Sequence, residues 1–303
     1  MSAIIQAKQI LKQYNGVTVV DRISFDVQHG ECFGILGPNG AGKTTTMRMI
    51  IGLAGVTEGQ LHVFGYPMSP EQRLVPPRLG VVSQEDNLDI DLSVSENLLV
   101  YGRYFGLSAR LIREQIPKLL EFAQLSDRGA SPVRELSGGM KRRLVIARSL
   151  INNPELVTLD EPTTGLDPQA RHLIWQRLRA LKEKGTTLLL TTHYMEEAAQ
   201  ICDRLLILNH GQILDQGTPA DLIKRHVESE VVEIRGCMLD SDLDCFENLP
   251  GRLERVGDTL FCYTHNADSV MAALKDHSAL TLLLRPSNLE DVFLKLTGRE
   301  LRD

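Results

Sequence analysis

The chain has 303 residues, of which 43% are hydrophobic and 24% are charged, a composition that fits a folded globular protein and excludes a disordered one. This length is enough for one large domain with a smaller appendage. The formal net charge of −6 argues against a nucleic-acid-binding protein, because a phosphate backbone requires a basic surface.

The longest apolar runs fall far short of the roughly 18 residues that cross a bilayer, and the first residues lack the apolar core of a secretion signal. We therefore expect a cytosolic chain that reaches a membrane only through a partner. No two cysteines form a CxxC pair, so we expect them to be reduced and mostly buried in packing. They are Cys32, Cys202, Cys237, Cys245 and Cys262.

The first third of the chain indicates short strands around a glycine-rich segment, with a turn at Asn15-Gly16. Strands are predicted over 4–10, 18–20, 23–27, 32–36, 57–65 and 78–84. The apolar strand over 32–36 runs into the glycine-rich residues 37–42, and a helix is predicted from Lys43 to about Ile51.

Residues 86–135 have a helical character and predict a subdomain inserted into a larger fold. Ser93 and Glu96 form a capping box that opens one helix. A second helix is predicted over 108–123, where apolar residues share one face. Pro117 should kink this second helix or divide it into two.

Beyond residue 137, helices and strands alternate, which is typical of a doubly wound, largely parallel sheet with right-handed crossovers. Helices are predicted over 140–151, 169–184 and 195–202, and strands over 156–159, 186–191 and 204–208. The expected fold is therefore α/β, with a parallel core, an antiparallel β subdomain and a helical subdomain. A short helix over 221–225 closes this first domain.

The last part of the chain predicts a small α+β domain after an acidic boundary. Between Glu228 and Glu247 acidic residues face a single base, Arg235, which suggests a boundary region. Further on, strands are predicted over 252–256, 259–264 and 280–284, and helices over 267–275 and 288–296. We therefore predict a large domain over 1–225, with its helical subdomain at about 86–135, and an accessory domain over 226–303.

The glycine-rich segment fits the phosphate-binding loop pattern. Its glycines allow backbone N–H groups to surround phosphates at the positive end of the following helix. Lys43 supplies a charge for the β- and γ-phosphates, and Thr44 supplies a hydroxyl for Mg²⁺. The predicted nucleotide-contacting residues here are Gly37, Pro38, Asn39, Gly40, Ala41, Gly42, Lys43, Thr44 and the following Thr45.

A second element follows the apolar strand over 156–159, which places Asp160 at the carboxyl end of the sheet, where ligands bind in open α/β folds. Asp160 is predicted to hold Mg²⁺, and Glu161 to polarise the attacking water. Alternatively, both acids only cap the next element. With the phosphate loop, this pair indicates a P-loop nucleotide hydrolase, and kinases, GTPases, helicases and transport ATPases all remain possible.

Three further features narrow the class. Ser137, Gly138 and Gly139 open a basic helix and form a second anion-binding helix end, which would be useful if one chain contacts a nucleotide held by another. Gln84 follows a strand, where its amide can touch metal or water. His193 follows the strand over 186–191, and a lone histidine there is also compatible with a structural role.

In this order and spacing, the motifs resemble those of the ABC transporter ATPase family over residues 4–222. The correspondence comprises Walker A at 37–44, Q-loop Gln84, the signature at 136–140, Walker B at 156–161, the D-loop at 165–167 and H-loop His193. The resemblance implies that Tyr14 stacks on adenine, that His193 contacts the γ-phosphate and that Asp167 links two nucleotide sites. It also implies catalytic roles for Lys43, Gln84, Glu161 and His193, and metal binding by Thr44, Gln84 and Asp160. Met140 stands where this signature usually has glutamine, which removes one side-chain hydrogen bond.

Four further segments, at 31–34, 102–106, 170–175 and 288–294, are similar to the nodulation-factor (lipo-oligosaccharide) exporter ATPases, relatives of the daunorubicin-resistance exporters. This resemblance extends over nearly the whole chain. It implies an ATPase homodimer that uses ATP and Mg²⁺ on the cytoplasmic face of a bacterial inner membrane. The chain would be peripheral there, bound to a separate integral membrane permease, and it would not contact the cargo.

Other functions remain alternatives. A non-transport ABC ATPase acting on a ribosome or on DNA usually carries tandem nucleotide domains or a basic face, which this acidic chain lacks. A binding-only regulatory subunit is disfavoured by the complete site, and a P-loop GTPase has no use for the Ser137 signature. In the accessory domain, an apolar face at Leu289, Val292, Phe293 and Leu296 must be buried, either within that domain or, as we prefer, in a unit that holds two ATPase chains together.

Overall fold

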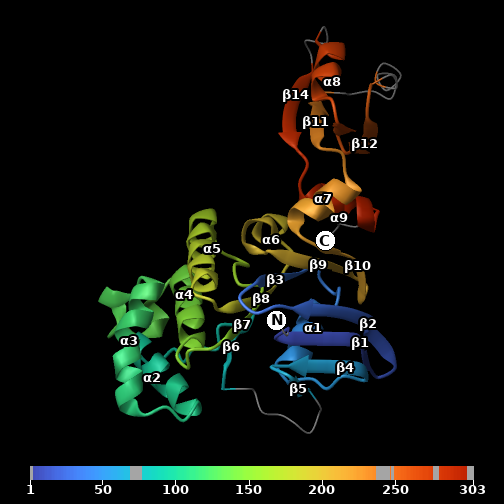
Figure 1. Ribbon diagram of the computed structural model, residues 1–303. Helices are drawn as coiled ribbons and strands as arrows, with labels where there is room; N and C mark the ends of the chain where they lie inside the picture. Colours follow the sequence, from blue (N-terminus) through green and yellow to red (C-terminus); the bar gives the residue numbers. More distant parts are fainter. Residues whose placement is uncertain (1–2, 69–76, 237–245, 247–248, 276–279, 299–303) are drawn as a thin grey trace. The chain divides into compact units, whose positions relative to one another are not determined.

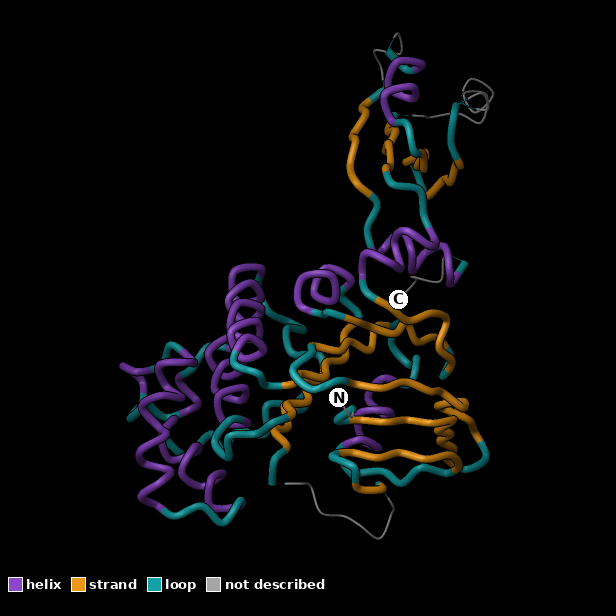
Figure 2. Tube along the Cα trace, in the orientation of Figure 1, coloured by secondary structure: helices purple, strands orange, loops and turns teal. Residues whose placement is uncertain are grey.

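The computed structural model describes residues 3–68, 77–236, 246, 249–275 and 280–298. Cys237 and Cys245 therefore lie outside the described residues. The chain divides into two compact units, residues 1–216 and 217–303. Figure 1 follows the chain by colour, and Figure 2 distinguishes its helices and strands.

The first unit is built on a sheet in the order β10-β9-β3-β8-β7-β6. The pairs from β9 to β6 are parallel, which confirms the predicted doubly wound core. Strands β3, β7 and β8 are buried along their whole length, as continuous apolar strands are when helices cover both faces. The bounds are β3 (Cys32–Leu36), β6 (Leu79–Val82), β7 (Leu156–Asp160), β8 (Thr187–Thr192), β9 (Arg204–Asn209) and β10 (Gln212–Gly217).

Strand β10 was not predicted. It lies at the edge of the sheet, so its residues alternate between exposed and half-buried, and polar side chains are tolerated along it. The helices of this core are α1 (Lys43–Ile50), α4 (Gly138–Ser149), α5 (Pro168–Glu183) and α6 (Met195–Ile201). Helix α1 follows β3 after the glycine-rich segment 37–42, as predicted, and packs against β8.

A second sheet of the first unit is antiparallel, in the order β2-β1-β4-β5. Asn15 and Gly16 both have positive φ angles, of 50° and 81°, which suits a tight two-residue hairpin turn. The two predicted strands at 18–20 and 23–27 are in fact one strand, which continues through Arg22 at φ 47°. The bounds are β1 (Ile5–Tyr14), β2 (Val17–Val27), β4 (Glu58–Val63) and β5 (Tyr66–Pro67).

The helical subdomain contains α2 (Val94–Tyr104) and α3 (Ala109–Ala123), which pack on each other and on α4. The capping box is confirmed: the Ser93 hydroxyl accepts from the Glu96 N–H at 3.2 Å, and the Glu96 carboxylate accepts from the Ser93 N–H at 2.8 Å. Helix α3 continues through Pro117, so the expected division into two helices is wrong. Pro117 and Arg113 are both exposed, so water can replace the hydrogen bond that proline cannot donate.

The second unit contains a sheet in the order β12-β13-β11-β14. Strand β11 lies between β13 and β14, so the acidic stretch that we interpreted as a boundary region contains a central strand of this sheet. Glu233 of β11 is buried, and its charge is compensated by Arg285, which donates to it at 2.7 Å, and by Arg235, which donates at 3.1 Å. The bounds are α7 (Pro219–His226), β11 (Glu230–Arg235), β12 (Arg252–Val256), β13 (Thr259–Thr264), α8 (Ala267–Ala273), β14 (Thr281–Pro286) and α9 (Leu289–Thr297).

The apolar face of α9 is covered inside the second unit. Leu289, Val292 and Phe293 are buried, and α7 packs against α9. The helix that covers this face, α7, lies on the other side of the boundary predicted at residue 225, so the face does not pack only within the predicted accessory domain. A role of this unit in holding two chains together stays a prediction. Among the described helices, none combines the length and the apolar character that crossing a bilayer requires.

Candidate nucleotide-binding site

The phosphate loop connects β3 to α1 and ends where α1 begins, at the positive end of that helix. Two of its glycines are required by close packing. A Cβ on Gly37 would lie 2.2 Å from the carbonyl oxygen of Leu208, and one on Gly42 would lie 2.7 Å from that of Val19. Gly42 also has a φ of 103°, which other residues rarely adopt. The loop therefore owes its shape to glycine at these positions.

Lys43 is buried beside this loop, with 4% of its surface exposed. Its ammonium donates to the carbonyl oxygens of Gly37 at 3.0 Å and Pro38 at 3.1 Å, and lies 3.3 Å from Oε1 of Glu161. A buried ammonium needs such partners, because burial without them costs several kcal/mol. The contacts hold the charge of Lys43 between the phosphate loop and the end of β7.

An oxygen-rich group lies next to the loop. The Thr44 hydroxyl donates to Oδ1 of Asp160 at 3.3 Å, and the Thr191 hydroxyl donates to the same oxygen. Hydroxyl and carboxylate oxygens are the ligands that Mg²⁺ prefers. The residues present therefore fit a Mg²⁺ ion bound between α1 and β7.

Glu161 follows β7 directly and is also buried. Its Oε1 lies 3.3 Å from both Lys43 Nζ and His193 Nδ1, and its Oε2 accepts from the Thr164 hydroxyl at 3.1 Å. Burial by itself would raise the pKa of Glu161, but its interactions with the Lys43 ammonium and the His193 ring outweigh this effect, so the pKa lies below its ordinary value. The side chain is thus a carboxylate at neutral pH, able to accept a hydrogen bond from water.

Predicted residues from three separate segments come together at one open pocket. Gln84 lines it from the segment that follows β6, and Glu161 lines it from the residue that follows β7. Val19 of β2, which the sequence did not single out, lines it as well. The lining residues are Val19, Asn39, Gly40, Gly42, Lys43, Thr44, Thr45, Gln84 and Glu161.

Three predicted features lie away from this pocket: Tyr14, the signature residues and Asp167. Tyr14 is 43% exposed at the end of β1 and does not line it. Ser137 caps α4, where its hydroxyl accepts from the Met140 N–H at 3.3 Å, and it is exposed with Gly138. Asp167 caps α5 by accepting from the Ala170 N–H at 2.9 Å. The signature therefore does not contribute to the pocket of its own chain.

Arg142 is the residue that sequence reasoning missed. It appeared there only as one of several bases in the helix after Ser137, but in the structure it is buried with 5% of its surface exposed. Its guanidinium donates to the backbone carbonyls of Asp160 and Glu161, both at 3.0 Å, beneath the site. Nothing in the local pattern distinguishes it from Lys141 or Arg143, because its partners come from distant segments.

Comparisons with known proteins agree with this geometry. The family model described as ABC transporter matches residues 20–164, and the model for the C-terminal domain of the nodulation factor export protein NodI matches residues 239–298. A structure of an ATP-binding subunit of an ABC transporter is 31% identical, with a TM-score of 0.66 over 73% of this chain and 92% of that one. A dimeric ATP-binding cassette bound to ADP and phosphate is 27% identical, with a TM-score of 0.65 over 71% and 98%.

The fold and the site define an ATP-hydrolysing subunit of an ABC-type transporter. Relatives described as Nod factor export ATP-binding protein I are 52% identical in Cupriavidus metallidurans, over 100% of both chains, and in Paraburkholderia xenovorans, over 99% of both. A third, from a Rhizobium species, is 52% identical over 96% of both chains. The chain belongs to the family of Nod factor export ATP-binding protein I.

Proposed function

We propose that this chain works as a homodimer that hydrolyses ATP to drive export of a lipo-oligosaccharide, or a related amphiphile, through a separate integral membrane permease. The observation that carries the hydrolytic part is the convergence of Lys43, Thr44, Asp160 and Glu161 at one edge of the sheet. The cargo class is taken from the relatives, which are described as Nod factor exporters.

Each residue of the site has a role in this proposal. Lys43 binds the β- and γ-phosphates, while Thr44 and Asp160, together with Gln84, hold Mg²⁺. When bound, Mg²⁺ would neutralise charge on the phosphate oxygens. Glu161 orients the attacking water, and His193, beside it, contacts the γ-phosphate.

The dimer is supported by the position of the signature. Ser137 and Gly138 are exposed at the N-terminus of α4, outside the pocket of their own chain. A helix N-terminus with bare glycine backbone suits an anion, and the nucleotide of a second chain would supply one. The related ATP-binding cassette that binds ADP and phosphate is itself described as dimeric.

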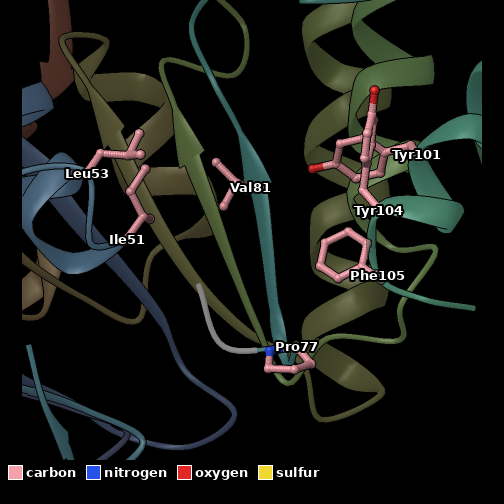
Figure 3. A pocket seen from close by; sticks show the side chains of 7 residues that line it. All are labelled: Ile51, Leu53, Pro77, Val81, Tyr101, Tyr104 and Phe105. Atoms are coloured by element: carbon pink, nitrogen blue, oxygen red, sulfur yellow. The ribbon is translucent and has the colours of Figure 1, made fainter. Parts of the chain in front are cut away.

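A second, apolar pocket is the proposed contact with the permease. Figure 3 shows the rings of Tyr101, Tyr104 and Phe105 facing Ile51 and Leu53 across Val81. Leu53 and Tyr104 are 71% and 80% exposed, so the pocket offers apolar surface to a partner. Val81 belongs to β6, which leads to Gln84, so a permease segment bound here would lie close to the segment that enters the nucleotide site. This contact would make the chain a peripheral protein at the cytoplasmic face of the inner membrane.

Glu161→Gln tests the hydrolytic site. ATP should still bind, because Lys43 and the phosphate loop are intact, but hydrolysis should fall by about a hundredfold or more once water loses its carboxylate. The trapped dimer should appear in sedimentation only with ATP. Glu155→Gln, which alters an exposed carboxylate just before β7, is the matched control and should hydrolyse ATP normally. Normal turnover in Glu161→Gln would assign the base to another residue.

Leu53→Asp tests the permease contact. A charge in the apolar pocket should abolish co-purification of the membrane subunit from native membranes, while ATP hydrolysis by the isolated chain persists. Leu111→Asp places the same charge at an exposed position on α3 that does not line the pocket. Equal recovery of the membrane subunit with both variants would locate its binding site elsewhere. Lipid and glycan analysis of the purified complex would test the cargo class.

A further inference from the structure

The guanidinium of Arg142 connects three parts of the first unit that are far apart in the sequence. Its Nη1 donates to the carbonyl of Ser83 at 2.6 Å and lies within hydrogen-bond distance of that of Gln84, at 3.3 Å. Its Nη2 donates to the carbonyls of Asp160 and Glu161, and its Nε donates to that of Pro162 at 2.8 Å. One side chain from α4 therefore holds both the segment of Gln84 and the segment of Glu161.

This arrangement requires arginine. A planar guanidinium carries five N–H donors in a fixed fork, whereas lysine has three donors on one nitrogen and cannot reach all five of these carbonyls. The nearest carboxylate, that of Asp86, is 3.7 Å away and its side chain is 37% exposed. Backbone carbonyls therefore surround the buried guanidinium, and its hydrogen bonds hold main-chain segments in place.

Arg142 also lies close to the signature. It lies five residues after Ser137 on α4, and Ser137 is the N-cap of that helix. A helix rises about 1.5 Å per residue and is stiff over this length, so a displacement at Ser137 moves Arg142 with it. The chain thus has a direct mechanical connection from the signature to the backbone of Asp160 and Glu161.

We propose that Arg142 is a positioning residue that couples nucleotide contact at Ser137 to the placement of Glu161 and Gln84. This inference rests on the proposed function, in which Ser137 contacts the nucleotide of a second chain. When α4 docks on the nucleotide held by the second chain, Arg142 would place the main chain of Glu161 in the nucleotide site of the first chain. Hydrolysis in each site would then depend on the other chain being in place.

Arg148 provides a matched control on the same helix. It is buried to a similar degree and donates to two carbonyls, those of Asp86 at 3.1 Å and Asn87 at 2.6 Å. Its guanidinium also stacks over Tyr101 at 4.6 Å. The hydrogen bonds found for Arg148 go to carbonyls just after Gln84. Removing the Arg148 guanidinium should therefore lower stability without displacing Glu161.

The first measurement compares Arg142→Met with Arg148→Met in the full chain, since methionine retains the apolar stem and removes the donors. Arg142→Met should bind ATP within about threefold of the native Kd, while kcat falls about 10- to 100-fold, as expected when a catalytic group is misplaced by an ångström or less. Arg148→Met should lower Tm comparably and keep kcat within about threefold. Arg142→Lys, which retains the charge and folds more readily, should show the same split between Kd and kcat in milder form. Native kcat in both Arg142 variants would overturn the inference.

A double-mutant cycle with Ser137→Ala then tests the coupling itself. If Ser137 acts through Arg142, the double variant Ser137→Ala/Arg142→Met should have about the kcat of the slower single variant. If the losses in kcat of the two single variants instead multiply, the two residues act independently. That result would overturn the coupling and leave the dimer proposal intact. Unchanged hydrolysis in Ser137→Ala alone would instead contradict the proposed contact between chains, and the coupling with it.

Discussion

At the scale of single residues, the charges of the nucleotide site meet at Glu161. Its carboxylate lies 3.3 Å from the Lys43 ammonium and 3.3 Å from the His193 ring, and its main chain has a φ of 47°. A glutamate in the left-handed region is held there at a cost of about 1–3 kcal/mol, which other contacts must offset. Arg142 and Thr191 supply these contacts, since they bond the carbonyl and the N–H of Glu161.

The lowered pKa of Glu161 predicts a defined pH dependence of stability. The ionised form is favoured in the folded state, so its contribution to the free energy of unfolding is present above the unfolded pKa of about 4.3. That contribution is lost as the pH falls through the lower folded pKa. The difference in unfolding free energy between the native chain and Glu161→Gln should therefore be constant near neutrality and shrink in the acid range. A difference that does not change between neutral pH and pH of about 3 would contradict the assignment.

Tyr14 leads to a second prediction at this scale. Its ring is exposed at the end of β1 with the Lys12 ammonium 4.7 Å from its centre, and the adjacent strand β2 supplies Val19 to the pocket. Stacking of adenine on this ring would contribute about 1–3 kcal/mol, so Tyr14→Ala should weaken ATP binding roughly 5- to 150-fold. Tyr14→Trp should retain the affinity. Tyr66→Ala, at an exposed tyrosine on β5, controls for general effects, and equal Kd values in all variants would leave Tyr14 a surface residue.

At the scale of elements, a buried glutamate ties α6 to the segment that follows Glu161. Oε1 of Glu197 accepts from the Thr163 hydroxyl at 2.7 Å and from the Trp175 indole N–H at 3.1 Å. Thr163 lies two residues after Glu161, and Trp175 lies on α5, which begins after Asp167. Burial raises the pKa of Glu197, although these hydrogen bonds work against the shift. Helix α6 thus supports both the segment that follows Glu161 and helix α5, which begins after the D-loop.

The raised pKa of Glu197 predicts the opposite pH dependence from that of Glu161. The protonated form is favoured in the folded state, so ionisation costs stability, and the cost grows as the pH rises above the unfolded value of about 4.3 through the raised folded value. Glu197→Gln should therefore gain stability relative to the native chain as the pH rises, measured by urea unfolding at several pH values. Glu196→Gln, at the exposed neighbour, should show a flat difference. A flat difference for Glu197→Gln as well would show that its burial has no such cost.

At the scale of the whole molecule, the chain consists of two units, each stabilised by contacts within itself. The second unit begins at Gly217 and includes α7, whose Leu222 is buried and whose partner is α9. Within this unit, Arg285 donates to Glu233 at 2.7 Å and to Asp291 at 2.8 Å, which balances charge between β11, β14 and α9. A cut after Arg225, at the domain boundary that the sequence suggests, would separate α7 from α9.

This division predicts the behaviour of two truncated chains. A chain ending at Gln216 should remain soluble and bind ATP, because the nucleotide pocket is formed within residues 1–216. A chain ending at Arg225 should be less stable and more prone to aggregate, since it exposes Leu222. If the second unit also holds two chains together, the shorter chain should dimerise less without nucleotide, and its hydrolysis should depend more steeply on protein concentration. Identical sedimentation and hydrolysis of the Gln216 and full-length chains would rule out that dimer role.

Most of the fold and the hydrolytic core of the site could be predicted because their signals are local. A buried parallel strand is recognised as a continuous apolar run, and the glycines of the phosphate loop are recognised by their spacing within a few residues of Lys43. The capping box at Ser93 likewise needs only Glu96. Of the two alternatives predicted at Pro117, a division into two helices was wrong, because the missing hydrogen bond is tolerated on an exposed face of α3.

The sequence by itself determined the ATPase class and the order of motifs, because each motif is recognised from residues that are adjacent in the sequence. Tertiary structure alone decided how the buried charges are paired. Arg142 reaches Asp160 and Glu161, at the end of β7, from helix α4, and Glu233 is balanced by Arg285 from 52 positions away. The reason is physical: a buried charge is stable only beside its partners, and those partners are chosen by packing between elements that no local pattern records.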